Sequence, residues 1–222
     1  MALGIFDMDD TLVDGDSANL WLHHLVERGL APAEMLPREA ELLQAYRDGR
    51  VDMHEYMRFA LIPLRGVSMA TVQGWLTEFV DDVILPRIFP QALRRLEWHR
   101  ERQDRLLIIS ATGEHLVSAI AERLGVADSI GIMLETADGI YTGQTHGVLS
   151  YRDGKVTRLR QWLEDEGESL HGSFGYSDSL NDVPLLEAVE HKHAINPDAT
   201  LRQVAQERGW SVLAWQHAVE QA

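Results

Sequence analysis

Cysteine is absent from this chain of 222 residues. Its absence excludes disulfide bonds, thiol nucleophiles and zinc sites with cysteine ligands. A long apolar run is also missing, so no segment predicts a helix that spans a bilayer. Residues 1–6 lack the basic region and apolar run of a secretory signal, and a cytoplasmic location is therefore the expectation.

Positive charge is scarce in this chain. It has 20 Lys and Arg residues against 35 Asp and Glu residues, which gives a formal net charge of −15. Such a chain repels phosphate backbones and anionic lipids, so we expect neither nucleic acid nor a membrane surface as a partner. A small phosphorylated metabolite would need local positive charge at its site, from a divalent metal and one or two Lys or Arg side chains.

The short apolar run Ala2–Phe6 ends at a cluster of acids, Asp7, Asp9 and Asp10, which Thr11 follows. An apolar run bounded by turn residues predicts a buried strand of a parallel sheet. Ligands of open α/β sheets bind beyond the carboxyl ends of the strands, where these acids would lie. Clustered carboxylates repel each other and are costly to desolvate, so the pattern favours a bound cation over a solvated turn or helix cap.

The rest of the chain alternates between predicted helices and strands. Strands are expected over 105–110, 129–135, 172–176, 193–195 and 210–215, with a short hairpin near 139–143. Helices are expected over 17–29, within 33–62, and over 68–84, 89–99, 113–124, 155–166 and 182–188. This alternation predicts an α/β fold with a doubly wound parallel sheet. Residues 15–85 carry no strand signal, so we expect a helical cap over 15–85 and a core formed by 1–14 and 86–222.

Four motifs in order resemble those of the haloacid dehalogenase (HAD) superfamily of phosphohydrolases. Residues 7–11 fit D-x-D-x-T, Ser110 ends a predicted strand, and Lys155 precedes a predicted helix. Residues 175–186 are similar to the fourth motif, G-D/S-x-x-N-D with a Pro-Leu-Leu continuation. The position of the helical segment, just after the first motif, resembles subfamily IB, the phosphoserine phosphatase-like branch with an inserted helical C1 cap.

The resemblance implies a Mg²⁺-dependent phosphatase that works through an aspartyl-phosphate. It implies that Asp7 is the nucleophile and Asp9 the general acid and base. The residues expected to bind phosphate are Thr11, Ser110, Ala111 and Lys155. The residues expected to hold Mg²⁺, which prefers oxygen ligands, are Asp7, Asp9 through its backbone carbonyl, Asp178 and Asp182.

The cap is expected to select the substrate. The candidates for contact with the leaving group are Asp16, Ser17, Trp21, His24, Arg58, His115 and Asn181. Phosphoserine phosphatases usually have a Glu shortly after the first motif and Gly-Gly after the serine of the second. Here Gly15-Asp16-Ser17 and Ala111-Thr112-Gly113 stand there, which resembles a bacterial group containing histidinol-phosphate phosphatases. An acidic pocket would suit the cationic amine and imidazole of histidinol.

Three other readings stay open at this point. The enzyme could act on phosphoserine, or it could transfer the phosphoryl group to a second alcohol. A receiver-type signalling domain also uses an acid pair, a phosphorylated Asp, a Ser or Thr and a Lys. The chain is long for a receiver, and an acid two residues after the nucleophile favours fast hydrolysis over a stored phosphoryl group.

Overall fold

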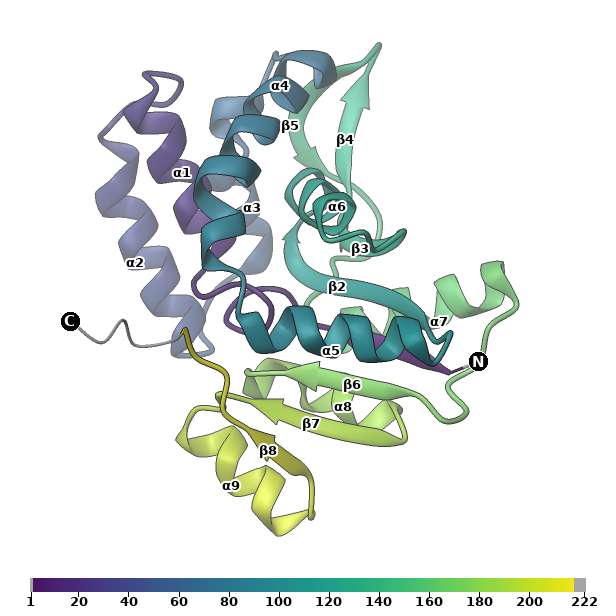
Figure 1. Ribbon diagram of the computed structural model, residues 1–222. Coiled ribbons are helices and arrows are strands. Elements are labelled where there is room, and N and C mark those ends of the chain that lie inside the picture. The colour runs from purple at the N-terminus through teal and green to yellow at the C-terminus, as the bar shows by residue number, and fades with distance from the viewer. Residues whose placement is uncertain (1, 218–222) are drawn as a thin grey trace, which may run out of the picture.

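The computed structural model describes residues 2–217, in which a six-stranded parallel sheet forms the centre of the molecule (Figure 1). The strand order is β3-β2-β1-β6-β7-β8. The strands are β1 (Leu3–Phe6), β2 (Arg105–Gly113), β3 (Asp128–Ile132), β6 (Phe174–Ser177), β7 (His191–Ile195) and β8 (Ser211–Leu213). The doubly wound α/β class predicted from the sequence is confirmed.

Helices cover both faces of this sheet because its strands are apolar on both sides. Leu3 and Ile5 of β1 pack against α7 (Asp153–Glu166) and α8 (Val183–Ala188). Phe6 faces the other way and packs with residues of α5 (Pro90–Glu101) and α6 (Glu114–Arg123). Burial on both faces is what makes β1 a continuous apolar run in the sequence.

The strand order places a crevice at the middle of the sheet. Strand β1 pairs with β2 on one side and with β6 on the other, so Phe6 lies beside both Ile108 and Tyr176. The sheet order reverses here, and crevices at such switch points bind ligands in open α/β folds. The residues that follow β1 and β6, and the end of β2, therefore meet at one edge of the sheet.

Helices rise above that edge between β1 and α5 (Figure 1). They are α1 (Ser17–Glu27), α2 (Met35–Arg47), α3 (Met53–Ala60) and α4 (Met69–Phe79), followed by a π-helical turn over Val80–Ile84. Asp16 caps α1 by accepting a hydrogen bond from the Asn19 amide at 2.9 Å. The helical character predicted for 15–85 is thus confirmed. The split into cap and core at residues 14 and 86 stays a prediction, and residues 1 and 218–222 lie outside the described residues.

A two-stranded hairpin joins this helical layer from the core side. It consists of β4 (Leu134–Ala137) and β5 (Ile140–Thr145), and it matches the hairpin expected near 139–143. Tyr141 exchanges backbone hydrogen bonds with Gly66 and Val67, at 2.8 and 3.0 Å. The single strand predicted over 129–135 is wrong, because the chain leaves the main sheet after Ile132 and the Leu134 amide donates to Glu114 instead.

Two further findings complete the fold. Helix α9 (Ala199–Glu207), which the sequence reading missed, packs Leu201 and Ala205 against Leu186 and Ala194. No helix among residues 2–217 combines the length and the apolar character needed to cross a membrane.

Close backbone packing at Gly131 generates a stability prediction. A Cβ at Gly131 would lie 2.5 Å from the Cα of Glu114, where backbone cannot yield, so Gly131→Ala should lower the free energy of unfolding by about 1–3 kcal/mol. The matched control is Gly74→Ala inside α4, where nothing lies within 4 Å and the change should stabilise by about 0.5–1 kcal/mol. Urea unfolding of both variants measures this, and equal effects would contradict the packing described.

Candidate active site

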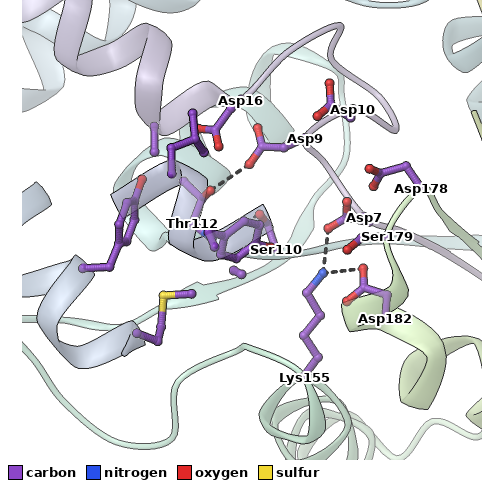
Figure 2. Close-up of a pocket in the computed structure, with 16 residues that line it drawn as sticks. Asp7, Asp9, Asp10, Asp16, Ser110, Thr112, Lys155, Asp178, Ser179 and Asp182 are labelled. Atoms are coloured by element: carbon purple, nitrogen blue, oxygen red, sulfur yellow. Dashed lines mark hydrogen bonds and ion pairs between the residues drawn. The ribbon is translucent and has the colours of Figure 1, made fainter. Parts of the chain in front are cut away.

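The loop after β1 turns its acids into the crevice. The Asp7 amide donates to the carbonyl of Tyr176 at 2.9 Å, which ties the end of β1 to β6. Met8 and Leu12 are fully buried, and the amide of Leu12 donates to the carbonyl of Met8 at 2.8 Å. Because alternate residues point to opposite sides, burial of Met8 in the core leaves Asp7 and Asp9 facing the cavity (Figure 2).

The cavity lies between the sheet edge and the cap and encloses about 610 Å³ of space, including its mouth. Core residues on its wall come from the segments after β1 and β6, from the end of β2 and from α7 (Figure 2). Cap residues on its wall are Asp16, Ala18, Leu43, Tyr46, Met53 and Tyr56. Six carboxylates and one lysine line it, so the cavity is strongly acidic.

Lys155 is the cation of this cavity. Its Nζ lies 2.6 Å from Oδ1 of Asp7 and 2.7 Å from Oδ2 of Asp182, and all three side chains are buried. Burial alone would lower the pKa of Lys155, but the carboxylates of Asp182 and Asp7 outweigh it and raise the pKa above its usual value. Ser177 also donates to Asp182 at 2.8 Å, so Asp182 fixes the position of the ammonium group.

Asp7 and Asp178 lie close enough to be bridged by one side chain. Oγ1 of Thr11 is 3.4 Å from Oδ2 of Asp7 and 3.2 Å from Oδ1 of Asp178. Burial raises the pKa of Asp7 to about 7, with Lys155 lowering it and Asp182 raising it. Burial, followed by repulsion from Asp7 and Asp10, raises the pKa of Asp178 well above its usual value. A cation between the two carboxylates would remove this repulsion.

The carboxylates of Asp7 and Asp178 suit part of the coordination shell of a magnesium ion. Asp7 and Asp178 present hard oxygen ligands at the strand ends, and Figure 2 shows their side chains directed toward the same space. Within residues 2–217, no three acidic or histidine side chains are placed to hold an ion by themselves. The remaining positions would go to a backbone carbonyl, waters or a phosphate oxygen, which is how Mg²⁺ is usually bound.

Asp9 is positioned by hydrogen bonds from Ser17 and Thr112. Its Oδ1 accepts from the Ser17 amide and its Oδ2 accepts from Oγ1 of Thr112, both at 2.8 Å. Burial raises its pKa to about 7, and the charge of Asp16 adds to this while the hydrogen bonds from Ser17 and Thr112 oppose it. A carboxyl group with a pKa near 7 exchanges protons readily at neutral pH, as a general acid and base must.

The end of β2 contributes Ser110 and Ala111 to the same cavity. Ser110 is buried, its Oγ accepts from the Thr112 amide at 3.2 Å, and its carbonyl accepts from Ser150 at 2.6 Å. These bonds fix the strand end beside Asp7 and Lys155. A hydroxyl and backbone amides at a strand end suit phosphate oxygens.

The substrate candidates divide between two cavities and the surroundings. Asp16 lines the first cavity, and burial raises its pKa to about 6. Trp21 and His115 line a second cavity of about 500 Å³, which shares Ala18, Tyr56 and Thr112 with the first. Ser17 is buried and supports Asp9 through its amide.

Besides Ser17, three candidates line neither cavity. His24 is buried among aromatic rings, 5.4 Å from Phe79 between centroids, and Arg58 is exposed. Asn181 accepts from Nε of Arg152 at 3.0 Å, and the same guanidinium donates to the carbonyl of Gly49 in the cap at 3.0 Å. Asn181 therefore belongs to a link between core and cap.

Several cavity residues were missed from the sequence. They are Glu39, Leu43, Tyr46, Met53, Tyr56, Thr112 and Ser179. Glu39 gives the clearest example, because it is only 3% exposed and accepts from Nδ2 of Asn19 at 2.5 Å. In the sequence it lies in a polar stretch of a predicted helix, where an acid is normally solvated. Thr112 could have been predicted as a cavity residue, because it lies two residues after Ser110 of the second motif.

The raised pKa of Asp9 generates a stability prediction. Its pKa is about 7 in the fold against 3.8 for the ordinary group, so the folded state loses stability as pH rises from about 4 to about 7 and the loss levels off above that. Asp9→Asn mimics the protonated form and removes this loss. In EDTA the variant should melt above wild type at pH 5 and at pH 8, with a gap at least about 2 °C wider at pH 8. Scanning calorimetry at both pH values measures the gap, and a gap independent of pH would contradict the assignment.

Comparison with known proteins agrees with this geometry. The sequence profile of haloacid dehalogenase-like hydrolases matches residues 5–187. A histidinol-phosphatase of Neisseria meningitidis serogroup C (strain 8013) is 38% identical over 216 residues, covering 95% of this chain and 97% of that protein. A phosphoserine phosphatase of Mycobacterium tuberculosis is 34% identical over 220 residues, covering 95% of this chain and 70% of that protein.

A solved structure gives the same result for the fold. A protein of unknown function from Bordetella pertussis Tohama I superimposes with a TM-score of 0.89 at 39% identity, covering 96% of this chain and 97% of the other. The resemblance seen in the motifs is therefore confirmed at the level of the family. The chain belongs to the haloacid dehalogenase-like hydrolases and is a phosphoric monoester hydrolase of that family.

Proposed function

We propose that the chain hydrolyses its phosphomonoester in two steps through Asp7. In the first step a carboxylate oxygen of Asp7 attacks phosphorus, the P–O bond to the alcohol breaks, and Asp9 donates its proton to the leaving oxygen. In the second step water attacks phosphorus, Asp9 takes a proton from that water, and the bond between Asp7 and phosphorus breaks. The pKa of about 7 for Asp9 suits both directions of proton transfer.

The surrounding residues position the phosphoryl group. Lys155 lies 2.6 Å from the proposed nucleophile and would share its charge between Asp7 and the phosphoryl oxygens. Ser110 and the amide of Ala111 would bind the remaining oxygens, and Thr11 orients Asp7. Mg²⁺ held by Asp7, the carbonyl of Asp9 and Asp178, with Asp182 as a further candidate ligand, would neutralise charge on phosphate. Positioning and charge neutralisation carry most of the acceleration in phosphoryl transfer.

We propose histidinol phosphate as the substrate, and the observation that carries this choice is the charge of the cavity walls. Among the described residues that line the two cavities, Lys155 is the single Lys or Arg, and it is already paired with Asp7 and Asp182. Asp16 adds a half-buried carboxylate and Glu39 a buried one on the cap side. A leaving group with an ammonium group and an imidazole would complement them. The relative from Neisseria named histidinol-phosphatase supports the same substrate.

Phosphoserine is the rival substrate, since one relative is named a phosphoserine phosphatase. Its leaving group carries a carboxylate as well as an ammonium group. That carboxylate would enter an acidic cavity with no free arginine or lysine on the described walls, at a cost of several kcal/mol. The cavity therefore favours the leaving group that has no acid.

A substrate panel tests the proposal directly. Phosphate release should require Mg²⁺, disappear in EDTA, and be lost in Asp7→Asn. Histidinol phosphate should be hydrolysed with a kcat/KM at least about 100-fold above that of phosphoserine, because like charges placed together cost several kcal/mol. Asp138→Asn at the hairpin tip, exposed and far from the acids in the fold, is the matched control and should behave as wild type. Equal rates on both substrates would overturn the choice of substrate, and full activity of Asp7→Asn would overturn the mechanism.

A further inference from the structure

The second cavity adjoins the phosphate cavity but has a different character. The two share Ala18, Tyr56 and Thr112, so a ligand anchored beside Asp7 can extend from one into the other. The second cavity is mostly apolar, with Leu22, Leu25, Met57 and Leu61 among its walls. A flat apolar group on the leaving alcohol would fit such walls.

Polar ring atoms are buried in this apolar cavity without a partner. Trp21 is 4% exposed, and its Nε1 finds no hydrogen-bond acceptor within residues 2–217. Both Nδ1 and Nε2 of His115 are likewise buried and unpaired in the described part of the chain. Most buried polar groups in proteins are paired, because an unpaired one has lost its hydrogen bonds to water without replacement. Three such atoms on the wall of one cavity indicate a ligand with complementary polar atoms.

The ring of His115 packs against the backbone of Gly113 and near two aromatic rings. Its Cε1 and Nδ1 lie 2.8 Å from where a Cβ on Gly113 would stand, so the ring occupies the space that glycine leaves open. Its centroid lies 6.2 Å from that of Trp21 and 6.3 Å from that of Tyr141. Burial lowers the pKa of His115 to about 3, so the ring is neutral at physiological pH. A neutral imidazole offers one donor and one acceptor.

Glu39 adds a carboxylate to the same cavity. Its side chain is 3% exposed and is oriented by Asn19, whose Nδ2 donates to Oε2 at 2.5 Å. The walls thus present an N–H donor on Trp21, a donor and an acceptor on His115, and carboxyl oxygens on Glu39. An aromatic ring with both an N–H and an unprotonated nitrogen matches this set, whereas a phenyl ring does not.

We propose that the second cavity binds a nitrogen-containing aromatic ring on the leaving alcohol, with Trp21, His115 and Glu39 exchanging hydrogen bonds with its ring nitrogens. This inference rests on the proposed function, because it requires the phosphate to lie beside Asp7. It goes further in assigning recognition to three side chains of one cavity. Trp21, His115 and Glu39 bind the leaving group and take no part in the chemistry at phosphorus.

A pair of esters tests this subsite. Histidinol phosphate and phenylalaninol phosphate have the same chain and amino group and differ in whether the ring carries nitrogen. Wild type should prefer histidinol phosphate by at least about tenfold in kcat/KM, because a site built to hydrogen-bond a group rejects the analogue that lacks it. A ratio near one would overturn the subsite and leave the proposed chemistry standing.

Conservative variants assign the preference to residues. Trp21→Phe and Glu39→Gln should each reduce the ratio about two- to tenfold, chiefly by raising the KM for histidinol phosphate, since each removes or weakens one hydrogen bond. The matched controls are Trp75→Phe on the same cap and Glu41→Gln on the same helix, which line neither cavity and should keep the wild-type ratio. An unchanged ratio in both Trp21→Phe and Glu39→Gln would overturn the assignment.

Equilibrium binding separates this inference from the proposed function. Asp7→Asn with Mg²⁺ should bind histidinol phosphate at least about tenfold more tightly than phenylalaninol phosphate by titration calorimetry, whether or not wild type turns over either ester. Tighter binding without turnover in wild type would support the subsite and refute the hydrolase proposal. Equal binding, or binding of neither ester, would refute the subsite.

Discussion

The ion pairs of Lys155 with Asp7 and Asp182 are the interaction on which the rest of the site depends. Three ionisable side chains lie buried together, with contacts of 2.6 and 2.7 Å. A buried carboxylate without a cation would be expensive, and removing one partner of such a group usually costs several kcal/mol. The chain has only two lysines, and one of them is placed here. The parallel sheet brings Lys155, Asp7 and Asp182 together from three distant segments of the chain.

The sheet and the helical layer above it contribute different residues to the two cavities. The segments after β1 and β6 supply most of the acids, the end of β2 supplies Ser110 and α7 supplies Lys155, whereas the helical layer supplies Asp16, Glu39 and apolar walls. The cavity beside Asp7 is therefore strongly acidic, and the second cavity is mostly apolar, with ring nitrogens that have no partner within residues 2–217. Arg152 links the two parts by donating hydrogen bonds to both Asn181 and the carbonyl of Gly49. Cap closure over a small ligand would exclude water from the acids.

Much of the core could be predicted from the sequence because its signals are local. The apolar run before Asp7, the strand predicted over 105–110 and the motif at Asp178 each predict the end of a strand. The parallel topology then brings these strand ends together. Lys155 could be predicted only from the order of motifs, because an isolated lysine before a helix is usually on the surface. The roles assigned to these residues stay predictions, while their convergence is a finding.

The cap and the hairpin could not be predicted in the same way. The break after Ile132 depends on a contact between Leu134 and Glu114, which lie 20 residues apart, and no local pattern encodes it. Burial of Glu39 depends on Asn19 in another helix. The second cavity is defined by residues from α1, α2, α3, the end of β2 and the start of α6, so it exists only in the folded chain. The second cavity, which we propose selects the substrate, is therefore the part of the structure that the sequence predicts least well.

The central claim is that Asp7 carries the phosphoryl group during turnover. Acid quenching during steady-state hydrolysis with Mg²⁺, followed by peptide mapping by mass spectrometry, measures this most directly. The account predicts one phosphoryl group on the peptide that contains Asp7, formed and lost at rates compatible with turnover. A phosphoryl group on another residue, or turnover with no phosphorylated peptide under conditions that preserve acyl phosphates, would contradict it.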